Sequence, residues 1–354
     1  TLRAKQRATR GVCGIAAGNP GILTKHRESR YNIHMKLHIP NSAFLGNIDP
    51  FLKNFDPTRP DSLDITANDK WISVHPAVLS MIAALGVTVD PKDIHCQKFE
   101  AKSSHYLARM GLFKTLKIPF DGAFVEHEPA GRFIPITQIR SSDELSKFIT
   151  EMVPLLHLEP EQSRTIGYII SELARNVIEH AESEYGAFLC AQYYKKSNTI
   201  RIGIADTGVG IKATITRSHP ARTDLEAIKL ALWPGITGAT SREGGTEQNA
   251  GAGLFFIKSI ASINRDFFVV YSGGALYKLL KKKAGSSARL HADPFKDRHS
   301  QEENLPVWRG TVVGADITLD QTAEFSALLD AIASTYKTAV RERVKARYRG
   351  PKFI

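Results

Sequence analysis

The clearest pattern in the chain is a run of apolar residues at helical spacing near its middle. Ile166, Ile169, Leu173 and Val177 recur at intervals of three and four residues, which gives a helix one apolar face. A capping box at 141–144 predicts that another helix begins just before this one. Similar spacing predicts further helices, at residues 74–86, 105–116, 224–232 and 322–336.

Shorter alternating or continuously apolar stretches predict strands. They lie at residues 31–40, 62–67, 87–89, 94–99, 186–194, 199–205 and 311–319. The strands at 186–194 and 199–205 are joined by a short connection, so we expect them to pair as antiparallel neighbours. Residues 120–136 contain two glycines and two prolines, which predicts linker and turn.

The order of these elements predicts an α/β (α+β) protein with two domains. Strands and helices alternate over residues 31–135, which favours a small α/β layer domain. A second domain is expected at 136–320. Residues 1–30 are predicted to form a basic arm, and residues 321–354 an amphipathic helix followed by a basic tail.

Composition narrows the class of protein. Apolar residues make up 42% and charged residues 23%, as in soluble globular proteins, and no apolar run is long enough to predict a membrane span. The three widely spaced cysteines argue against a disulfide framework or a zinc site and favour a cytoplasmic location. Glycine and proline interrupt the apolar part of the first 30 residues, so we expect an arm there rather than a signal peptide.

The net charge of +11 is concentrated at the two ends of the chain. Basic clusters of this kind attract nucleic acid or an acidic partner. Solvated basic tails are the more frequent explanation. Contact with nucleic acid through the termini is therefore an alternative that the charge permits but does not favour.

The helix at 166–178 carries a carboxylate and an amide on one face. Glu172 and Asn176 are four residues apart, so their side chains lie one above the other. A carboxylate beside an amide can hold a hydrated Mg²⁺ and orient a water toward a phosphate. Taken alone, such a pair is more often a solvated helix surface, so the motifs that follow decide its interpretation.

Three glycine motifs follow this helix. Asp206-Thr207-Gly208-Val209-Gly210 comes directly after the predicted strand at 199–205. Gly251-Ala252-Gly253-Leu254 opens an apolar helix, and Gly310-Thr311 begins the last predicted strand. Glycine lets the backbone bend and lets a ligand approach closely, and the free N–H groups at a helix start can bind phosphate.

Together and in this order, the Glu/Asn helix and the three motifs resemble the GHKL ATPase superfamily. This superfamily includes the ATPase domains of gyrase, histidine-kinase catalytic domains and anti-sigma-factor kinases. The resemblance covers residues 140–320 and implies a Bergerat-fold sandwich of helices on a sheet that binds ATP and Mg²⁺. Residues 31–135 resemble, more diffusely, the STAS-like modules that precede some bacterial ATPases. Their phosphorylatable Asp-Ser-Gly is missing here, and Ser73 is the nearest hydroxyl.

The resemblance implies a role for each polar motif residue. Glu172 is the expected general base, and Asn176 the expected ligand of Mg²⁺. His180 lies one turn further along the helix, near the phosphates. Asp206 is expected to accept a hydrogen bond from the adenine amino group, and Thr311 to support Asp206 and the adenine.

The glycine motifs are expected to shape the two ends of a nucleotide site. Gly208 and Gly210 let the base approach, whereas Gly251, Gly253 and Leu254 open the phosphate-binding helix start.

The long interval at 212–250 is rich in glycine. Insertions of this kind are disordered or act as lids, and the resemblance implies an ATP lid in which Arg242 can reach a phosphate. Lys258, one turn into the following helix, could add positive charge for the phosphates, but a single lysine is more often simply exposed, and we expect it to be exposed.

We therefore expect Mg²⁺-dependent ATP binding with slow hydrolysis, or phosphotransfer to a protein Ser/Thr, in a regulatory switch. This makes the protein an ATPase or a protein serine/threonine kinase with a protein partner or phosphoacceptor, and a homodimer stays open. The alternatives are an ATP-gated binding module without catalysis and a nucleic-acid-associated ATPase. No histidine-bearing dimerisation hairpin precedes the second domain, which argues against a histidine autokinase.

Overall fold

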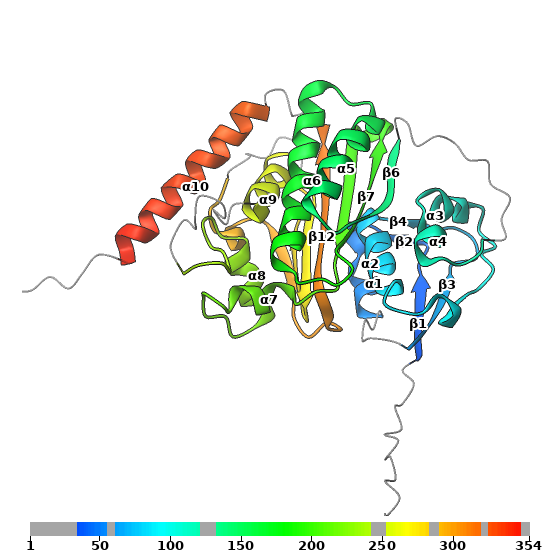
Figure 1. The fold of residues 1–354 in the computed structure, drawn as a ribbon. Coiled ribbons are helices and arrows are strands. Elements are labelled where there is room, and N and C mark those ends of the chain that lie inside the picture. The colour runs from blue at the N-terminus through cyan, green and yellow to red at the C-terminus, as the bar shows by residue number, and fades with distance from the viewer. Residues whose placement is uncertain are drawn as a thin grey trace, which may run out of the picture. The chain divides into compact units, whose positions relative to one another are not determined.

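A computed structural model describes most of the chain, and Figure 1 shows its helices and strands. The described residues are 34–54, 61–120, 132–241, 253–282, 290–319 and 325–347. They contain both helices and sheets, so the coarser α+β class predicted from the sequence is confirmed. Those from residue 34 onward belong to one compact unit. No helix among them is both long enough and apolar enough to cross a membrane.

A seven-stranded antiparallel sheet forms the centre of this unit, in the order β11-β10-β9-β12-β8-β7-β6. Its strands are β6 (Phe133–Ile139), β7 (Ala187–Tyr194), β8 (Thr199–Ala205), β9 (Phe268–Gly273), β10 (Ala275–Leu279), β11 (His299–Glu302) and β12 (Trp308–Thr318). The predicted antiparallel pair is β7 and β8, which confirms that expectation. The predicted linker at 120–136 is wrong for its last residues, because β6 begins at Phe133.

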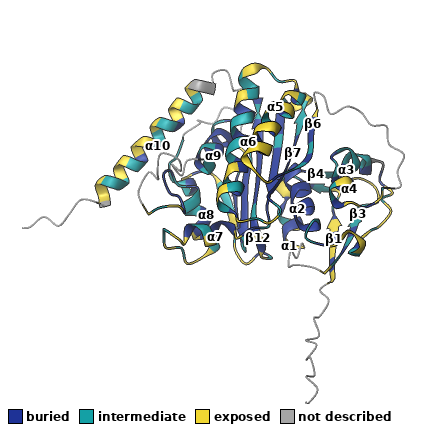
Figure 2. Cartoon of the chain, in the orientation of Figure 1, coloured by how far each residue is buried: buried dark blue, intermediate teal, exposed yellow. Residues whose placement is uncertain are grey.

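Helices cover one face of the sheet. They are α5 (Ser142–Glu151), α6 (Pro160–His180) and α9 (Gly253–Ile263), with α7 (Gly210–Ile215) and α8 (Asp224–Ala231) between β8 and α9. Helix α10 (Phe325–Arg347) contacts α9 and α6. The predicted capping box is confirmed in one half only, because Ser141 Oγ accepts a hydrogen bond from the Glu144 N–H at 3.2 Å, whereas the Glu144 carboxylate accepts from the Arg140 N–H at 2.6 Å and not from that of Ser141. The apolar face of α6 is buried against the sheet in a core that also includes α9. In Figure 2 the outward side of α6 is coloured teal and yellow, which marks intermediate and exposed residues.

The N-terminal part contains a three-stranded parallel sheet in the order β1-β3-β5 and a short pair β2-β4. The strands are β1 (His34–Ile39), β2 (Ser42–Ala43), β3 (Ser62–Ala67), β4 (Ser73–Val74) and β5 (Ile94–Cys96), and the helices are α1 (Asp49–Lys53), α2 (Pro76–Gly86), α3 (His105–Arg109) and α4 (Leu112–Leu116). We refer to residues 34–120 as the N-terminal module.

Two of its predicted elements differ from the structure. The expected strand at 87–89 is a turn. The expected helix at 105–116 is broken into α3 and α4 at Gly111, whose φ of 79° takes the backbone out of the helical region.

Helix α2 packs directly on the face of the large sheet opposite α6. Gly203 of β8 and Gly314 of β12 are cross-strand partners, and both lie under the start of α2. A Cβ at position 203 would stand 2.0 Å from the Ala77 nitrogen, and one at 314 would stand 3.2 Å from the Ala77 Cβ. The two glycines therefore form a flat place on the sheet where the helix backbone fits.

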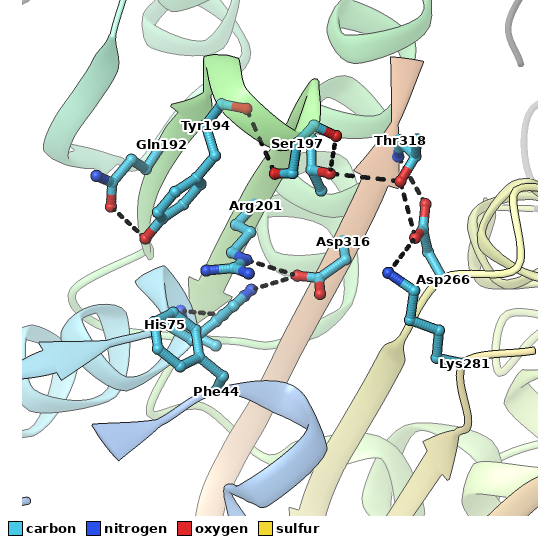
Figure 3. A network of polar contacts seen from close by, with 12 residues as sticks. Phe44, His75, Gln192, Tyr194, Ser197, Arg201, Asp266, Lys281, Asp316 and Thr318 are labelled. Carbon is cyan, nitrogen blue, oxygen red and sulfur yellow. Dashed lines mark hydrogen bonds and ion pairs between the residues drawn. The ribbon is translucent and has the colours of Figure 1, made fainter. Parts of the chain in front are cut away.

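A buried polar network joins the module to the same two strands (Figure 3). His75 Nδ1 accepts a hydrogen bond from the Ala77 N–H at 3.0 Å. The ring proton is therefore on Nε2, which donates a hydrogen bond to Asp316 Oδ1 at 3.1 Å. Burial lowers the pKa of His75, which favours this neutral form. Arg201, next to Asp316 across the strands, has its Nε 3.5 Å from the Asp316 carboxylate. Its guanidinium stacks on the Phe44 ring of the module, 4.3 Å from the ring centroid.

We expect Gly203→Ala to lower the free energy of unfolding by about 1–3 kcal/mol, the usual cost of overpacking. The added methyl group would meet the backbone of α2 rather than a flexible side chain. Gly167→Ala in α6 is the matched control, because its Cβ has no neighbour closer than 4.0 Å. That variant should gain up to about 1 kcal/mol from helix propensity. Chemical denaturation measures both, and equal stability of the two variants would contradict this account of the packing.

Candidate functional site

A cavity of about 280 Å³ lies among α6, α7, the start of α9 and the strands β8 and β12. It is lined by most of the residues singled out in the sequence, namely Glu172, Asn176, His180, Asp206, Gly210, Gly253, Leu254 and Thr311. Gly208 lies next to this lining but is not part of it. Gly251 lies outside the described residues. Segments that are distant in the sequence thus contribute to one cavity.

Helix α6 presents its carboxylate and amide to this cavity. Glu172 lies against the first residue of α9, because a Cβ at Gly253 would stand 2.6 Å from Glu172 Oε2. Burial raises the pKa of Glu172, Arg175 opposes this shift, and Glu179 adds to it. Asn176 Nδ2 is buried and has no hydrogen-bond partner among the described residues. An unmatched amide in a cavity wall is available to a ligand.

Asp206 is a buried carboxylate that no cation neutralises among the described residues. Its Oδ1 accepts a hydrogen bond from the Gly208 N–H at 2.8 Å, and its Oδ2 accepts one from the Thr311 N–H at 3.1 Å. Burial raises the pKa of Asp206 to about 7, although these two bonds lower it. A carboxylate has about four acceptor positions, so Asp206 can accept a further donor from the cavity.

Backbone contacts hold Asp206 in this place. Its N–H donates to the Thr311 carbonyl at 3.0 Å, and its carbonyl accepts from the Trp308 indole at 2.9 Å. The register of β12 shifts between Trp308 and Thr311. Gly310 makes this possible, because its φ is 104° and a Cβ there would stand 2.2 Å from the Asp206 carbonyl oxygen. The Gly-Thr motif therefore shapes the carboxylate's surroundings mainly through its backbone.

His180 lies at the C-terminal end of α6, in the cavity wall. Its carbonyl oxygen accepts a hydrogen bond from Thr214 Oγ1 of α7 at 3.2 Å. Its ring Nε2 is 4.0 Å from the carboxylate of its neighbour Glu179. The backbone of this residue therefore fixes α7, while its ring contributes to the wall.

The interval predicted to be a lid contains two helices in its described part. The predicted helix at 224–232 is confirmed as α8, which buries Leu225 and Ile228 in the core. Ile236, Thr237 and Gly238 follow it and line the cavity. Arg242 lies outside the described residues.

Lys258 corrects one expectation, because it is fully buried rather than exposed. Its ammonium group donates to Asp297 Oδ2 at 2.8 Å and to the His291 carbonyl at 3.0 Å. Asp297 also accepts from Ser262 Oγ at 3.1 Å. The acid comes from a part of the chain almost forty residues away, so the local sequence gave no sign of the pair. Lys258 therefore anchors α9 and is not part of the cavity lining.

The C-terminal helix is longer than the sequence predicts. The sequence predicts a helix at 322–336 followed by a solvated basic tail, but α10 continues to Arg347. Arg343 donates to the Pro234 carbonyl, and its guanidinium lies 5.8 Å from the centroid of the Trp233 ring. Pro234 lies just before the cavity-lining residues 236–238. The sequence indicates only which side of the helix Arg343 occupies, since it continues the three- and four-residue spacing of Ile332, Tyr336 and Ala339.

Comparison with known proteins does not assign the chain to a family. Scanned against models of protein families, the chain matches none, and a search of curated proteins finds no matching sequence.

We expect Arg343→Gln to lower the free energy of unfolding by about 0.5–1 kcal/mol, the worth of a partly exposed cation–π contact. The change removes the charge over Trp233 and a donor to the Pro234 carbonyl. Arg341→Gln is the control, because Arg341 is exposed on the same helix. Denaturation followed by tryptophan fluorescence compares the two, and equal effects would show that α10 does not hold this loop.

Proposed function

We propose that the cavity binds ATP together with Mg²⁺, in the manner of the GHKL ATPases that the sequence motifs resemble. The observation that carries the proposal is Asp206, a buried carboxylate at a cavity wall with spare acceptor capacity and no neutralising cation among the described residues. An exocyclic amino group is the donor that suits such an acceptor. Guanine carries a carbonyl at the position of the adenine amino group and would face the carboxylate unfavourably.

The opposite side of the cavity suits phosphates. The start of α9 lies against Glu172 and Asn176, and the first N–H groups of a helix favour an anion. Mg²⁺ usually keeps several waters and takes one or two protein oxygens in addition to substrate phosphates. The side-chain oxygen of Asn176 can serve as such a ligand, and the unmatched Asn176 Nδ2 is a donor that suits a phosphate oxygen. When bound, the metal would neutralise phosphate charge.

Glu172 is the proposed general base. Its raised pKa makes it a better proton acceptor than an exposed carboxylate. It would take a proton from the attacking oxygen, either of water or of a protein Ser or Thr hydroxyl, as that oxygen approaches the terminal phosphate. Water gives slow hydrolysis, and a hydroxyl gives phosphotransfer to a protein partner.

The setting of this activity is part of the proposal. We place the protein in the cytoplasm, because the described cysteines Cys96 and Cys190 are free thiols and such thiols suit a reducing compartment. We propose a regulatory role with a protein partner, since the module packed on the far face of the sheet offers a second surface. Labelled ATP incubated with the protein separates the activities, because label appears as free phosphate, on protein, or on neither if ATP only binds.

We expect Asp206→Asn to weaken binding of a non-hydrolysable ATP analogue by at least about 10-fold, the scale of one unmatched buried polar group. The amide would turn a donor toward the adenine amino group or toward one of the two backbone N–H groups. Calorimetry measures the affinity.

Asp266→Asn is the matched control for this variant. Asp266 is also buried, burial raises its pKa to about 6, and it accepts from a backbone N–H of β12, at Thr318. It does not line the cavity. Both variants should lose stability, but only Asp206→Asn should lose nucleotide affinity. Equal affinities in the two would remove Asp206 from the adenine role.

We expect Glu172→Gln to keep ATP binding and to reduce turnover by about 10²-fold or more, the scale of a lost general base. In the unaltered protein, turnover should fall as the pH drops through the raised pKa of Glu172, because only the ionised carboxylate accepts a proton. Glu161→Gln, at the start of the same helix, should leave the rate unchanged, because Glu161 pairs with Arg164 and does not line the cavity. A Glu172→Gln variant with the original rate would rule out this residue as the base.

A further inference from the structure

A second cavity, of about 320 Å³, lies between the N-terminal module and the edge of the large sheet. Its volume is in the lower range of cavities that hold small molecules. The module contributes side chains from α3 and the turn after it, and the sheet contributes the start of β6 and the end of β7. The lining residues are Tyr106, Arg109, Met110, Arg132, Phe133, Gln192, Tyr193 and Lys195.

Backbone hydrogen bonds fix both walls of this second cavity. The Ile136 N–H of β6 donates to the Met110 carbonyl of the module at 2.8 Å. The β6–β7 register shifts between Ile134 and Thr137, so Ile136 has no partner in β7 and its N–H can bond to the module. The Tyr193 N–H of β7 donates to the Arg132 carbonyl at 2.7 Å. The cationic side chains of this cavity are thus carried by backbone segments that hydrogen bonds hold in place.

Three cations line this cavity without a counter-charge among the described residues. Arg109, Arg132 and Lys195 take part in no ion pair within the described part of the chain. In addition, Arg109 Nε is buried and has no acceptor there. Arg201, by comparison, faces Asp316. A buried donor left unmatched beside like charges is costly, and an anion in the cavity would remove both costs.

The remaining wall is aromatic. The Tyr193 hydroxyl donates to Asn198 Oδ1 at 2.8 Å, and the Tyr106 hydroxyl donates to the Val74 carbonyl at 3.5 Å. Because both hydroxyls are engaged elsewhere, these rings and Phe133 offer mainly apolar surface to the cavity. The site therefore combines a strongly cationic part with a surface suited to a small organic group.

We propose that this second cavity binds a phosphomonoester, whose dianionic phosphate lies among Arg109, Arg132 and Lys195 and whose organic part lies against the aromatic wall. A phosphomonoester fits better than a carboxylate because it brings nearly two charges and three acceptor oxygens, and guanidinium groups match phosphate geometry. The cations come from both the module and the sheet edge. A bound phosphate therefore strengthens the attachment of the module to the sheet.

Calorimetry of the full chain with phenyl phosphate tests this proposal. The medium contains a saturating non-hydrolysable ATP analogue, so that the cavity at Asp206 is not the one titrated. We expect Arg109→Gln to weaken binding at least 10-fold and Lys195→Gln to weaken it several-fold. Lys196→Gln is the control, because Lys196 is exposed next to Lys195 and does not line the cavity. Affinity should also fall below pH 6, where the phosphate loses its second charge.

Two further ligands identify the source of the phosphate. Tighter binding of a phosphoserine peptide than of phenyl phosphate identifies a phosphorylated protein side chain, and the reverse order identifies a small metabolite. Binding of neither at millimolar concentration overturns the proposal. So does binding that Arg109→Gln and Lys195→Gln leave unchanged. Because Lys195 is exposed, its variant keeps the test valid if Arg109→Gln fails to fold, which circular dichroism shows.

Discussion

The pairing of β8 with β12 is the constraint on which the rest of this structure depends. These two strands lie at the centre of the sheet and face each other over seven residue pairs, from Ala205–Val312 to Thr199–Thr318. Just beyond one end of the pairing, Asp206 is held by the backbone of β12 in the wall of the candidate site. At its middle, Gly203 and Gly314 receive α2 of the N-terminal module. A shift of one residue in this register would turn every side chain to the other face and separate these features.

The sheet consequently serves two cores at once. Successive residues of a strand point to opposite faces, and the two hydrophobic clusters divide the strands accordingly. Leu189 and Val313 belong to the core under α6 and α9, whereas Cys190 and Val312 belong to the core shared with the module. The seven-stranded sheet therefore has little exposed face, and the cavity under α6 and the module on the far face are joined by one layer of backbone. A structural change at the cavity can therefore reach the module through a single strand layer.

Buried carboxylates among the described residues differ in whether a cation lies beside them. This difference distinguishes carboxylates with a structural role from the one in the candidate site. Asp316 and Asp297 face cations, Arg201 and Lys258, and hold elements together. Among the described residues Asp206 has no cation partner and accepts from two backbone N–H groups, and burial raises its pKa to about 7. A buried carboxylate without a cation costs stability, and a donor supplied by a ligand in the cavity would reduce that cost.

The sequence by itself determined the local elements and the grouping of chemistry. The spacing of Ile166 to Val177 predicted α6, the capping box placed the start of α5, and the strands of the β7–β8 hairpin were evident, because these signals arise from neighbouring residues. The motif residues around Glu172 and Asp206 were chosen from sequence, and the fold brings most of them to one cavity. Tertiary structure alone decided the partner of Lys258, the contact of Arg343 with the loop after α8, and the packing of α2 on Gly203. Each joins residues distant in sequence, and a local pattern carries no information about which distant group will meet a side chain once water is excluded.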